Sequence, residues 1–173
     1  MKIVVAGDNH GLIDPLKRVI EDNPDGDMFL HTGDSMMSAI DILPFESVKG
    51  NNDFECFPIS KTVDTPAGKI YLIHGSRPFI YNVDNLKEQD IKVVIKGHTH
   101  YHKIEDDHGV TFVNPGALSN PRDNTNGTYL IITVEDEKFD FKFVYLDWIK
   151  NNAFFIDGQI SFFLTKKDFC YIY

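Results

Sequence analysis

Three of the chain's seven histidines lie within the heptapeptide KGHTHYH, residues 96–102, directly after the apolar run IKVVI. In an extended segment, alternate side chains point to the same side. His98 and His100 can therefore present two imidazoles to one place, while Thr99 faces the other way. Imidazole is a common metal ligand, so this spacing indicates that the two rings could serve neighbouring metal ions.

Four other apolar runs also end in a glycine-containing loop that carries Asp, Asn or His: KIVVAGDNHG, MFLHTGD, VKGNND and IYLIHG. In an open α/β sheet, ligands bind beyond the carboxyl ends of the strands, so these loops could converge. Glycine lets the backbone turn sharply beside each polar group. The resulting candidate metal ligands are Asp8, His10, Asp34, Asn51, His74, His98 and His100.

Each of these features has an ordinary explanation when taken alone. Asp8 could be a turn residue, His74 could be a hydrogen-bonded core histidine, and residues 50–53 have the composition of a turn. Turns explain the whole set poorly, because five separate strand ends carry only carboxylate, carboxamide and imidazole groups. We therefore interpret these residues as parts of one site.

The seven groups are too many for one tetrahedral zinc site and would suit two metals bridged by a carboxylate. A mixed oxygen and imidazole set favours Mn²⁺, Fe or Zn²⁺ over Ca²⁺ or Mg²⁺. Metals about 3.5–4 Å apart serve phosphoester hydrolysis, in which a bridging water is deprotonated as the nucleophile. The metals would also supply positive charge that the acidic chain otherwise lacks.

At this point the motifs GDNH, GD, GNND, HG and GHTH follow the order and spacing of the calcineurin-like metallophosphoesterases, which the chain resembles over about residues 1–147. The short length and NPGALSNPR (114–122) are similar to the small YfcE-type phosphodiesterases. The resemblance implies a four-layer sandwich, two mixed β-sheets flanked by helices. It also implies that Asp8, His10, Asp34 and His100 hold one metal, and that Asp34, Asn51, His74 and His98 hold the other, with Asp34 bridging. Mn²⁺ is the expected ion, with Ni²⁺, Zn²⁺ or Fe as alternatives.

One position departs from the pattern of many relatives, which have Gly-Asn-His-Asp where this chain has Gly-Asn-Asn-Asp. Asn52 can donate a hydrogen bond but cannot act as a general acid near pH 7. We therefore expect a preference for phosphodiesters with acidic leaving groups. The resemblance gives Asn52 a place near the substrate, and Asp53 orients the loop. Arg122 is a candidate phosphate contact, although a surface salt bridge is the more ordinary role.

The leading hypothesis is a metal-dependent phosphodiesterase acting on a small phosphodiester. A phosphomonoesterase is the nearer alternative. The more distant alternative is a non-catalytic scaffold, because a retromer subunit of eukaryotes has this fold and binds partner proteins. The complete set of ligand types favours an enzyme. His31, ahead of Asp34, could support a ligand, while His102 and His108 have no counterpart in the family's set and are expected to be solvated.

Hydrophobic patterning predicts an α/β (α+β) fold. Strands are expected at 2–6, 28–31 and 46–50, alternating with helices at 13–22 and 35–43, which favours parallel pairing. Two strands joined by a turn at 66–68 follow, then a helix at 83–90 and a strand at 92–96. The remainder, to residue 147, is a series of strands with short polar turns, so the α/β pattern is expected to give way to antiparallel β structure.

The 173 residues carry a net charge of −9, which argues against bulk nucleic-acid binding. Cys56 and Cys170 have no metal-type spacing. The apolar run at the start is too short for a signal peptide, and no run approaches the length that spans a membrane, so a cytoplasmic location is expected.

Residues 148–173 form an aromatic-rich extension beyond the predicted domain of residues 1–147. FFIDGQISFF contains Asp-Gly between apolar runs, which predicts a β-hairpin. This hairpin could cover a sheet edge of the domain, or it could form an interface in a homo-oligomer or with another partner.

Overall fold

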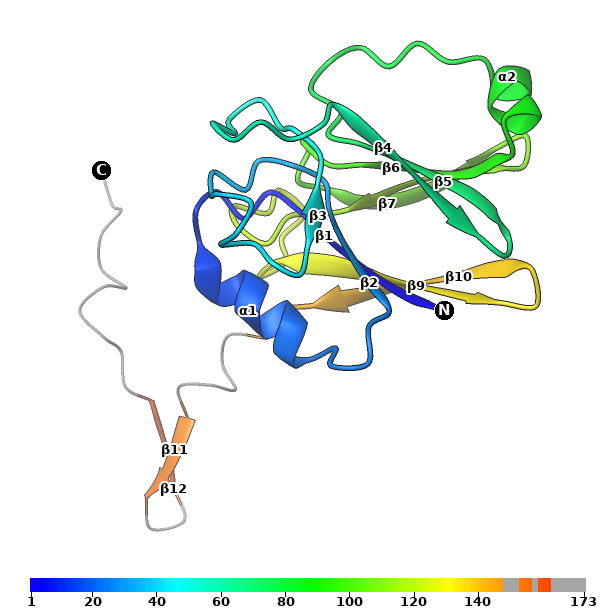
Figure 1. Ribbon diagram of the computed structural model, residues 1–173. Helices are drawn as coiled ribbons and strands as arrows, with labels where there is room; N and C mark the ends of the chain where they lie inside the picture. Colours follow the sequence, from blue (N-terminus) through cyan, green and yellow to red (C-terminus); the bar gives the residue numbers. More distant parts are fainter. Residues whose placement is uncertain (148–152, 157–158, 163–173) are drawn as a thin grey trace.

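The computed structural model describes residues 1–147, 153–156 and 159–162 (Figure 1). Two five-stranded sheets pack face to face. Helix α1 (Ile13–Glu21) covers the outer face of the first sheet, and α2 (Val83–Glu88) covers part of the outer face of the second. The predicted four-layer sandwich of two mixed sheets flanked by helices is confirmed. Neither helix in the described part of the chain is long and apolar enough to cross a membrane.

The first sheet has the order β10-β9-β1-β2-β3. Its central strand β1 (Lys2–Ala6) runs parallel to β2 (Met28–His31), which is parallel to β3 (Glu46–Ser47). On the other side β1 is antiparallel to β9 (Thr128–Glu135), and β9 to β10 (Lys138–Tyr145). The expected parallel pairing of the first three strands is confirmed.

The second sheet has the order β4-β5-β6-β8-β7. Strands β5 (Gly68–Ile73), β6 (Ile91–Lys96) and β8 (Val110–Pro115) are parallel. The edge strands β4 (Ser60–Thr65) and β7 (His102–Asp107) pair antiparallel with β5 and β8. The parallel β6–β8 pair therefore continues into the region that the sequence suggested was wholly antiparallel.

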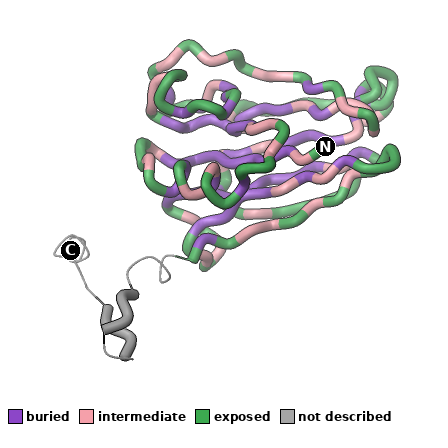
Figure 2. The backbone as a smooth tube through the Cα atoms, turned by 60° about the horizontal axis from the view of Figure 1, so that its bottom comes forward, coloured by how far each residue is buried: buried purple, intermediate pink, exposed green. Residues whose placement is uncertain are grey.

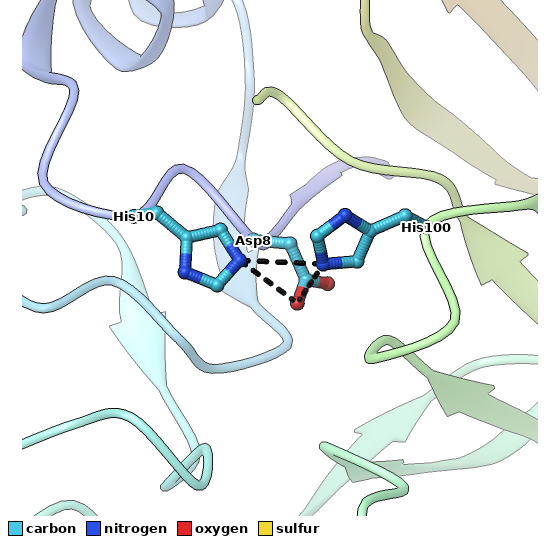
Figure 3. Close-up of side chains that lie close together, drawn as sticks. All are labelled: Asp8, His10 and His100. Atoms are coloured by element: carbon cyan, nitrogen blue, oxygen red, sulfur yellow. Dashed lines mark hydrogen bonds and ion pairs between the residues drawn. The ribbon is translucent and has the colours of Figure 1, made fainter. Parts of the chain in front are cut away.

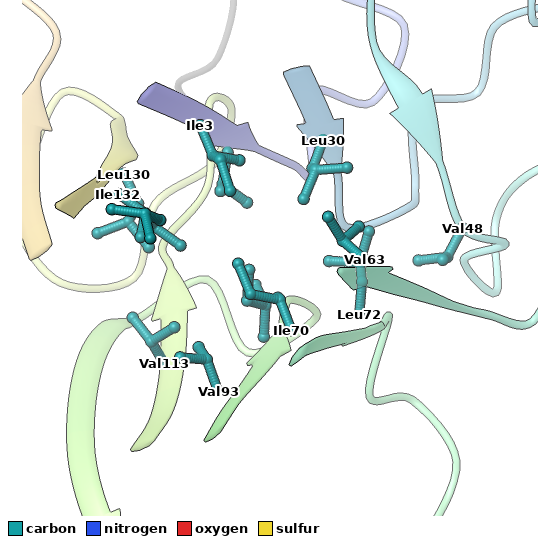
Figure 4. Close-up of a cluster of buried hydrophobic side chains, with 13 residues drawn as sticks. Ile3, Leu30, Val48, Val63, Ile70, Leu72, Val93, Val113, Leu130 and Ile132 are labelled. Carbon is teal, nitrogen blue, oxygen red and sulfur yellow. The ribbon is translucent and has the colours of Figure 1, made fainter. Parts of the chain in front are cut away.

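Strand alternation divides the apolar residues between layers. Ile3 and Val5 face the core between the sheets, where side chains of both sheets meet (Figure 4). Val4 and Ala6 face the opposite way and pack with Leu16 of α1. Figure 2 shows that buried backbone follows the strands of both sheets.

The helix predicted at residues 35–43 is wrong. Most of this segment forms turns, and Met36 has φ of 54°, which a right-handed helix does not allow. The amide of Met36 and the hydroxyl of Ser35 both donate to the carboxylate of Asp53, at 2.8 and 3.0 Å. These bonds to a distant side chain replace the helical ones, so the apolar spacing here does not produce a helix.

Within residues 148–173, β11 (Ala153–Ile156) pairs antiparallel with β12 (Gln159–Phe162), as the hairpin prediction required. The Asp-Gly pair at 157–158 lies outside the described residues. The proposed packing of the extension on the domain or at an interface therefore stays a prediction.

Candidate dinuclear metal centre

The seven candidate ligands lie in loops that follow the carboxyl ends of strands in both sheets. Loops after β1, β2 and β3 of the first sheet carry Asp8, His10, Asp34 and Asn51. Loops after β5 and β6 of the second sheet carry His74, His98 and His100. The facing sheets bring these loops to one edge of the sandwich, where the expected convergence is seen as two clusters of ligand atoms.

The first cluster contains Asp8, His10 and His100, whose ligand atoms all lie within 4.8 Å of one another (Figure 3). The Nε2 atoms of the two histidines are 3.3 Å apart. Asp8 Oδ1 lies 3.4 Å from Nε2 of His100 and 4.0 Å from Nε2 of His10. Asp8 is fully buried, and its Oδ1 atom has no hydrogen-bond partner among the described residues.

The second cluster contains Asp34, His74 and His98, again with ligand atoms within 4.8 Å. Nε2 of His74 lies 3.4 Å from Asp34 Oδ2 and 3.0 Å from Asn51 Oδ1, which adds the predicted carboxamide to the group. The amide of His98 donates to Asp8 Oδ2 at 3.1 Å, so a main-chain contact links the two clusters.

Main-chain carbonyls orient two of the imidazoles. Nδ1 of His74 donates to the carbonyl of Thr32 at 2.9 Å, and Nδ1 of His100 donates to that of Asn120 at 2.7 Å. A carbonyl only accepts, so each ring carries its proton on Nδ1, and Nε2 of a neutral ring directs a lone pair towards a carboxylate. Two acceptors facing each other repel unless a proton or a cation lies between them. This donor set therefore fits a divalent cation in each cluster.

The charge of Asp34 is strongly favoured. Burial opposes ionisation of this carboxyl, but hydrogen bonds from His74 and Asn52 outweigh burial and hold its pKa well below the usual range. The pKa of His74 is raised, because the opposing effect of burial is outweighed by its hydrogen bond to Asp34. Asp34 therefore carries its negative charge, and a proton beside His74 Nε2 is favoured there in the absence of a metal; a bound cation would take the place of that proton.

The backbone is unusual at most of the candidate ligands. Positive φ values of 45–70° occur at Asp8, His10, Asp34, His98 and His100. Such conformations are uncommon outside glycine and cluster at functional sites, where surrounding structure maintains them. Here the turn after each strand directs the side chain back over the sheet edge.

Two glycines permit the close packing of these loops. A Cβ atom on Gly50 would lie 2.1 Å from Oδ1 of Asp34, and one on Gly97 would lie 2.8 Å from Oδ2 of Asp8. Both contacts are with the carboxylates themselves. A side chain at either position would therefore displace a candidate ligand.

Asp53 and Asn52 occupy different positions in the site. Asp53 is buried and accepts from the amides of Asp34, Met36 and Gly50 and from the hydroxyl of Ser35, at 2.8–3.0 Å. Its carboxylate thus joins the loops after β2 and β3, in keeping with the orienting role expected of it. Asn52 is exposed, and its Nδ2 donates to Asp34 Oδ2 at 2.6 Å, which places it against the candidate bridging carboxylate.

Arg122 is exposed, and its amide donates to the carbonyl of His100 at 3.0 Å. Its guanidinium makes no ion pair with the residues that the structure describes, so the surface salt bridge considered for it is absent there.

One histidine outside the ligand set, His31, supports the site. His31 is fully buried; its Nδ1 accepts from the amide of Gly33 at 3.1 Å and its Nε2 donates to Asn9 at 3.0 Å. Burial lowers its pKa to about 4, so the ring is neutral and links the loops after β1 and β2.

His102 was expected to be solvated, but it is partly buried and makes specific contacts. Its amide and Nδ1 both donate to Asp123, at 2.9 and 2.7 Å, and its ring packs against Phe143 and Tyr145. The extended alternation predicted for KGHTHYH is wrong, because His98 and His100 have φ values of 70° and 61°, and no sequence signal indicated Asp123 as the partner of His102. His108, in contrast, is exposed, with an ion pair only to Asp107 among the described residues.

Comparisons with known proteins agree with this geometry. Residues 1–137 match the family described as the calcineurin-like phosphoesterase superfamily domain. The chain is 27% identical to the probable metallophosphoesterase YsnB of Bacillus subtilis over 152 residues, covering 83% of this chain and 90% of YsnB.

Solved structures share the fold. An archaeal phosphodiesterase superposes with a TM-score of 0.65 at 23% identity, covering 84% of this chain and 100% of that one. The phosphoesterase YfcE of E. coli gives 0.59 at 19% identity, covering 85% and 100%. Vps29 of Entamoeba histolytica, solved with Zn²⁺, gives 0.62 at 19% identity, covering 84% and 99%. Because the family match spans residues 1–137 of the 173, the chain belongs to the calcineurin-like phosphoesterase superfamily.

Proposed function

We propose that this protein is a phosphodiesterase that depends on two divalent metal ions. The observation that carries the proposal is the pair of adjacent Asp and His clusters at the shared strand ends, in which lone pairs of imidazole and carboxylate face each other. Two bound cations would offset the charge of a phosphodiester and lower the pKa of a coordinated water.

Seven residues would hold the metals. Asp8, His10 and His100 would hold one ion and Asn51, His74 and His98 the other, with Asp34 shared between them. Carbonyls of Thr32 and Asn120 fix the tautomers of two of the imidazoles, and His31 and Asp53 fix the loops. Mn²⁺ is the expected ion, because the donors mix oxygen with imidazole.

Asn52 sets the kind of ester that the site can cleave. Its carboxamide lies 2.6 Å from Asp34 Oδ2 and can donate to a phosphoryl oxygen, but it has no proton to give to a departing alkoxide near pH 7. Esters whose leaving group is itself acidic need no such proton. Small diesters with phenolic or other acidic leaving groups are therefore the proposed substrates.

The alternative of a non-catalytic scaffold shares the fold, as the likeness to Vps29 illustrates. The complete ligand set supports the enzyme, because seven converging ligands can hold the pair of metal ions that phosphoester hydrolysis uses.

The test is hydrolysis of bis-p-nitrophenyl phosphate and p-nitrophenyl phosphate by metal-stripped protein after addition of Mn²⁺, Ni²⁺ or Zn²⁺. We expect metal-dependent turnover, with the diester clearly preferred. A complete lack of turnover with every metal would refute the enzyme, and preference for the monoester, which releases the same p-nitrophenolate, would refute the phosphodiesterase.

A further inference from the structure

A pocket of about 410 Å³ lies beside the second cluster, and Asn51 and His74 form part of its wall. Pockets that hold small organic ligands measure roughly 300–1,000 Å³, so this one has room for an organic group. A phosphoryl group at the metal centre would leave most of the space free. The pocket is therefore placed to receive a substituent of the phosphate.

Part of the lining of the pocket is apolar. It is formed by Ile59 and Ile73 together with the rings of Tyr71 and Phe79. The two rings stack with centroids 5.8 Å apart and planes inclined by 24°, and Phe79 stacks in turn on Tyr81 at 5.4 Å and 26°. Each ring is thus held by a neighbour, which gives a preformed surface for another planar ring.

Two cations also line the pocket, although the chain as a whole carries a charge of −9. The Lys49 ammonium donates to the carbonyls of Asp53 and Glu55, at 3.1 and 2.7 Å, and it makes no ion pair with the residues that the structure describes. Arg77 is exposed and forms no ion pair within the described part of the chain. The electrostatics of this wall therefore favour a ligand that is anionic as well as aromatic.

We propose that the pocket binds a planar aromatic substituent, an aryl ring or a nucleobase, of the phosphodiester whose phosphate lies at the metal centre. The inference rests on the proposed function and narrows its substrate class. Phe79 is the residue that defines specificity, because it lines the pocket and its ring stacks on both Tyr71, which also lines the pocket, and Tyr81, which does not.

Non-hydrolysable phosphonates test this inference by binding alone. Methylphosphonate and phenylphosphonate share the phosphoryl group and differ only in the aromatic ring. Titration calorimetry of the Mn²⁺-loaded protein should give about tenfold tighter binding of phenylphosphonate, a ratio that combines stacking with apolar burial. In Phe79→Ala the ratio should fall towards one, and in Phe79→Leu, which keeps apolar bulk, it should be intermediate.

Ile80→Ala is the matched control, since Ile80 is the next residue, is 94% exposed and does not line this pocket. It should keep the wild-type ratio. Equal binding of both phosphonates by the wild-type protein, or an unchanged ratio in Phe79→Ala, would overturn the pocket assignment while leaving the phosphodiesterase proposal intact. Binding of neither phosphonate would instead count against the metal centre as a phosphoryl site.

An adenine-bearing alkylphosphonate separates the two kinds of ring. Tighter binding than phenylphosphonate would identify a nucleobase as the preferred group, and weaker binding would identify a plain aryl group. In both cases Phe79→Ala should remove the advantage over methylphosphonate.

Discussion

At the scale of single residues, Asn52 separates this site from relatives with histidine in its place. Its main-chain and side-chain nitrogens both donate to Asp34, at 2.7 and 2.6 Å, so it contacts both oxygens of the candidate bridge. A carboxamide in this position can orient a carboxylate or a phosphate, but it cannot transfer a proton at neutral pH. The leaving-group preference of the enzyme should therefore depend on this one side chain.

Replacement of Asn52 by histidine should restore a proton donor at the site. General acid catalysis contributes about 10²–10⁴-fold. We therefore expect kcat/KM to rise at least tenfold for phenyl phosphate, whose phenolate is a poor leaving group. Turnover of bis-p-nitrophenyl phosphate should change much less, because p-nitrophenolate leaves without protonation. Asn52→Gln is the control without a titratable group. An equal effect of the histidine on both substrates would contradict the argument.

At the scale of elements, hydrogen bonds to the carboxylates of Asp53 and Asp123, here called clamps, hold the loops that carry the ligands. Asp53 ties the loops after β2 and β3 through four accepted hydrogen bonds. Asp123 ties the loop after β8 to the start of β7 through His102, and Asn120 of the same loop orients His100. The strained backbone of the ligands therefore depends on side chains that never contact a metal.

Asp53→Asn keeps the shape of the side chain, but its new NH₂ group would face N–H and O–H groups that donate to the Asp53 carboxylate in the native protein. Leaving a buried donor unsatisfied costs about 1–3 kcal/mol, and in a domain of this size 1 kcal/mol corresponds to about 2–4 °C. We expect the melting temperature of the metal-stripped protein to fall by several degrees. Asp64→Asn, on an 86% exposed side chain, is the control and should leave it unchanged. An unaltered melting temperature in Asp53→Asn would show that the clamp is dispensable.

Asp123 gives the stability of the fold a dependence on acid pH. Burial raises its pKa, but hydrogen bonds from Thr125 and His102 outweigh burial and lower the pKa to about 2. A carboxyl depressed from an unfolded value near 3.9 stabilises the folded state above that value and loses its contribution as pH falls towards 2. Asp123→Asn should therefore be less stable than wild type in urea at pH 6, with the difference shrinking at pH 3. A difference that is constant over this range would contradict the assignment.

The sequence predicted the elements where local pattern and tertiary structure agree. Buried strands such as β1 and β6 and the amphipathic α1 follow directly from apolar spacing. The segment at 35–43 does not, because Asp53, distant in sequence, accepts hydrogen bonds from the Ser35 hydroxyl and the Met36 amide. The partnership of His102 with Asp123 escaped prediction for the same reason, since it joins residues 21 positions apart.

At the scale of the whole molecule, the site exists because two sheets place their strand ends at one edge. Six Asp and His residues spread over more than 90 positions become two compact clusters, each with ligand atoms within 4.8 Å, and Asn51 lies 3.0 Å from His74 in the second. The choice of these residues was accessible from the sequence, since polar groups beyond strand ends point to a shared site. Their distances, tautomers and supporting clamps were not, because those depend on how the two sheets pack.

The central claim is that this edge binds two metal ions with Asp34 shared between them. The direct measurement is elemental analysis and calorimetry of the protein after it is stripped of metal and titrated with Mn²⁺. We expect two ions per chain for wild type and for the control Asp64→Ala, and no more than one for Asp34→Ala. Two ions per chain in Asp34→Ala would contradict the shared ligand, and one or none in wild type would contradict the dinuclear centre itself.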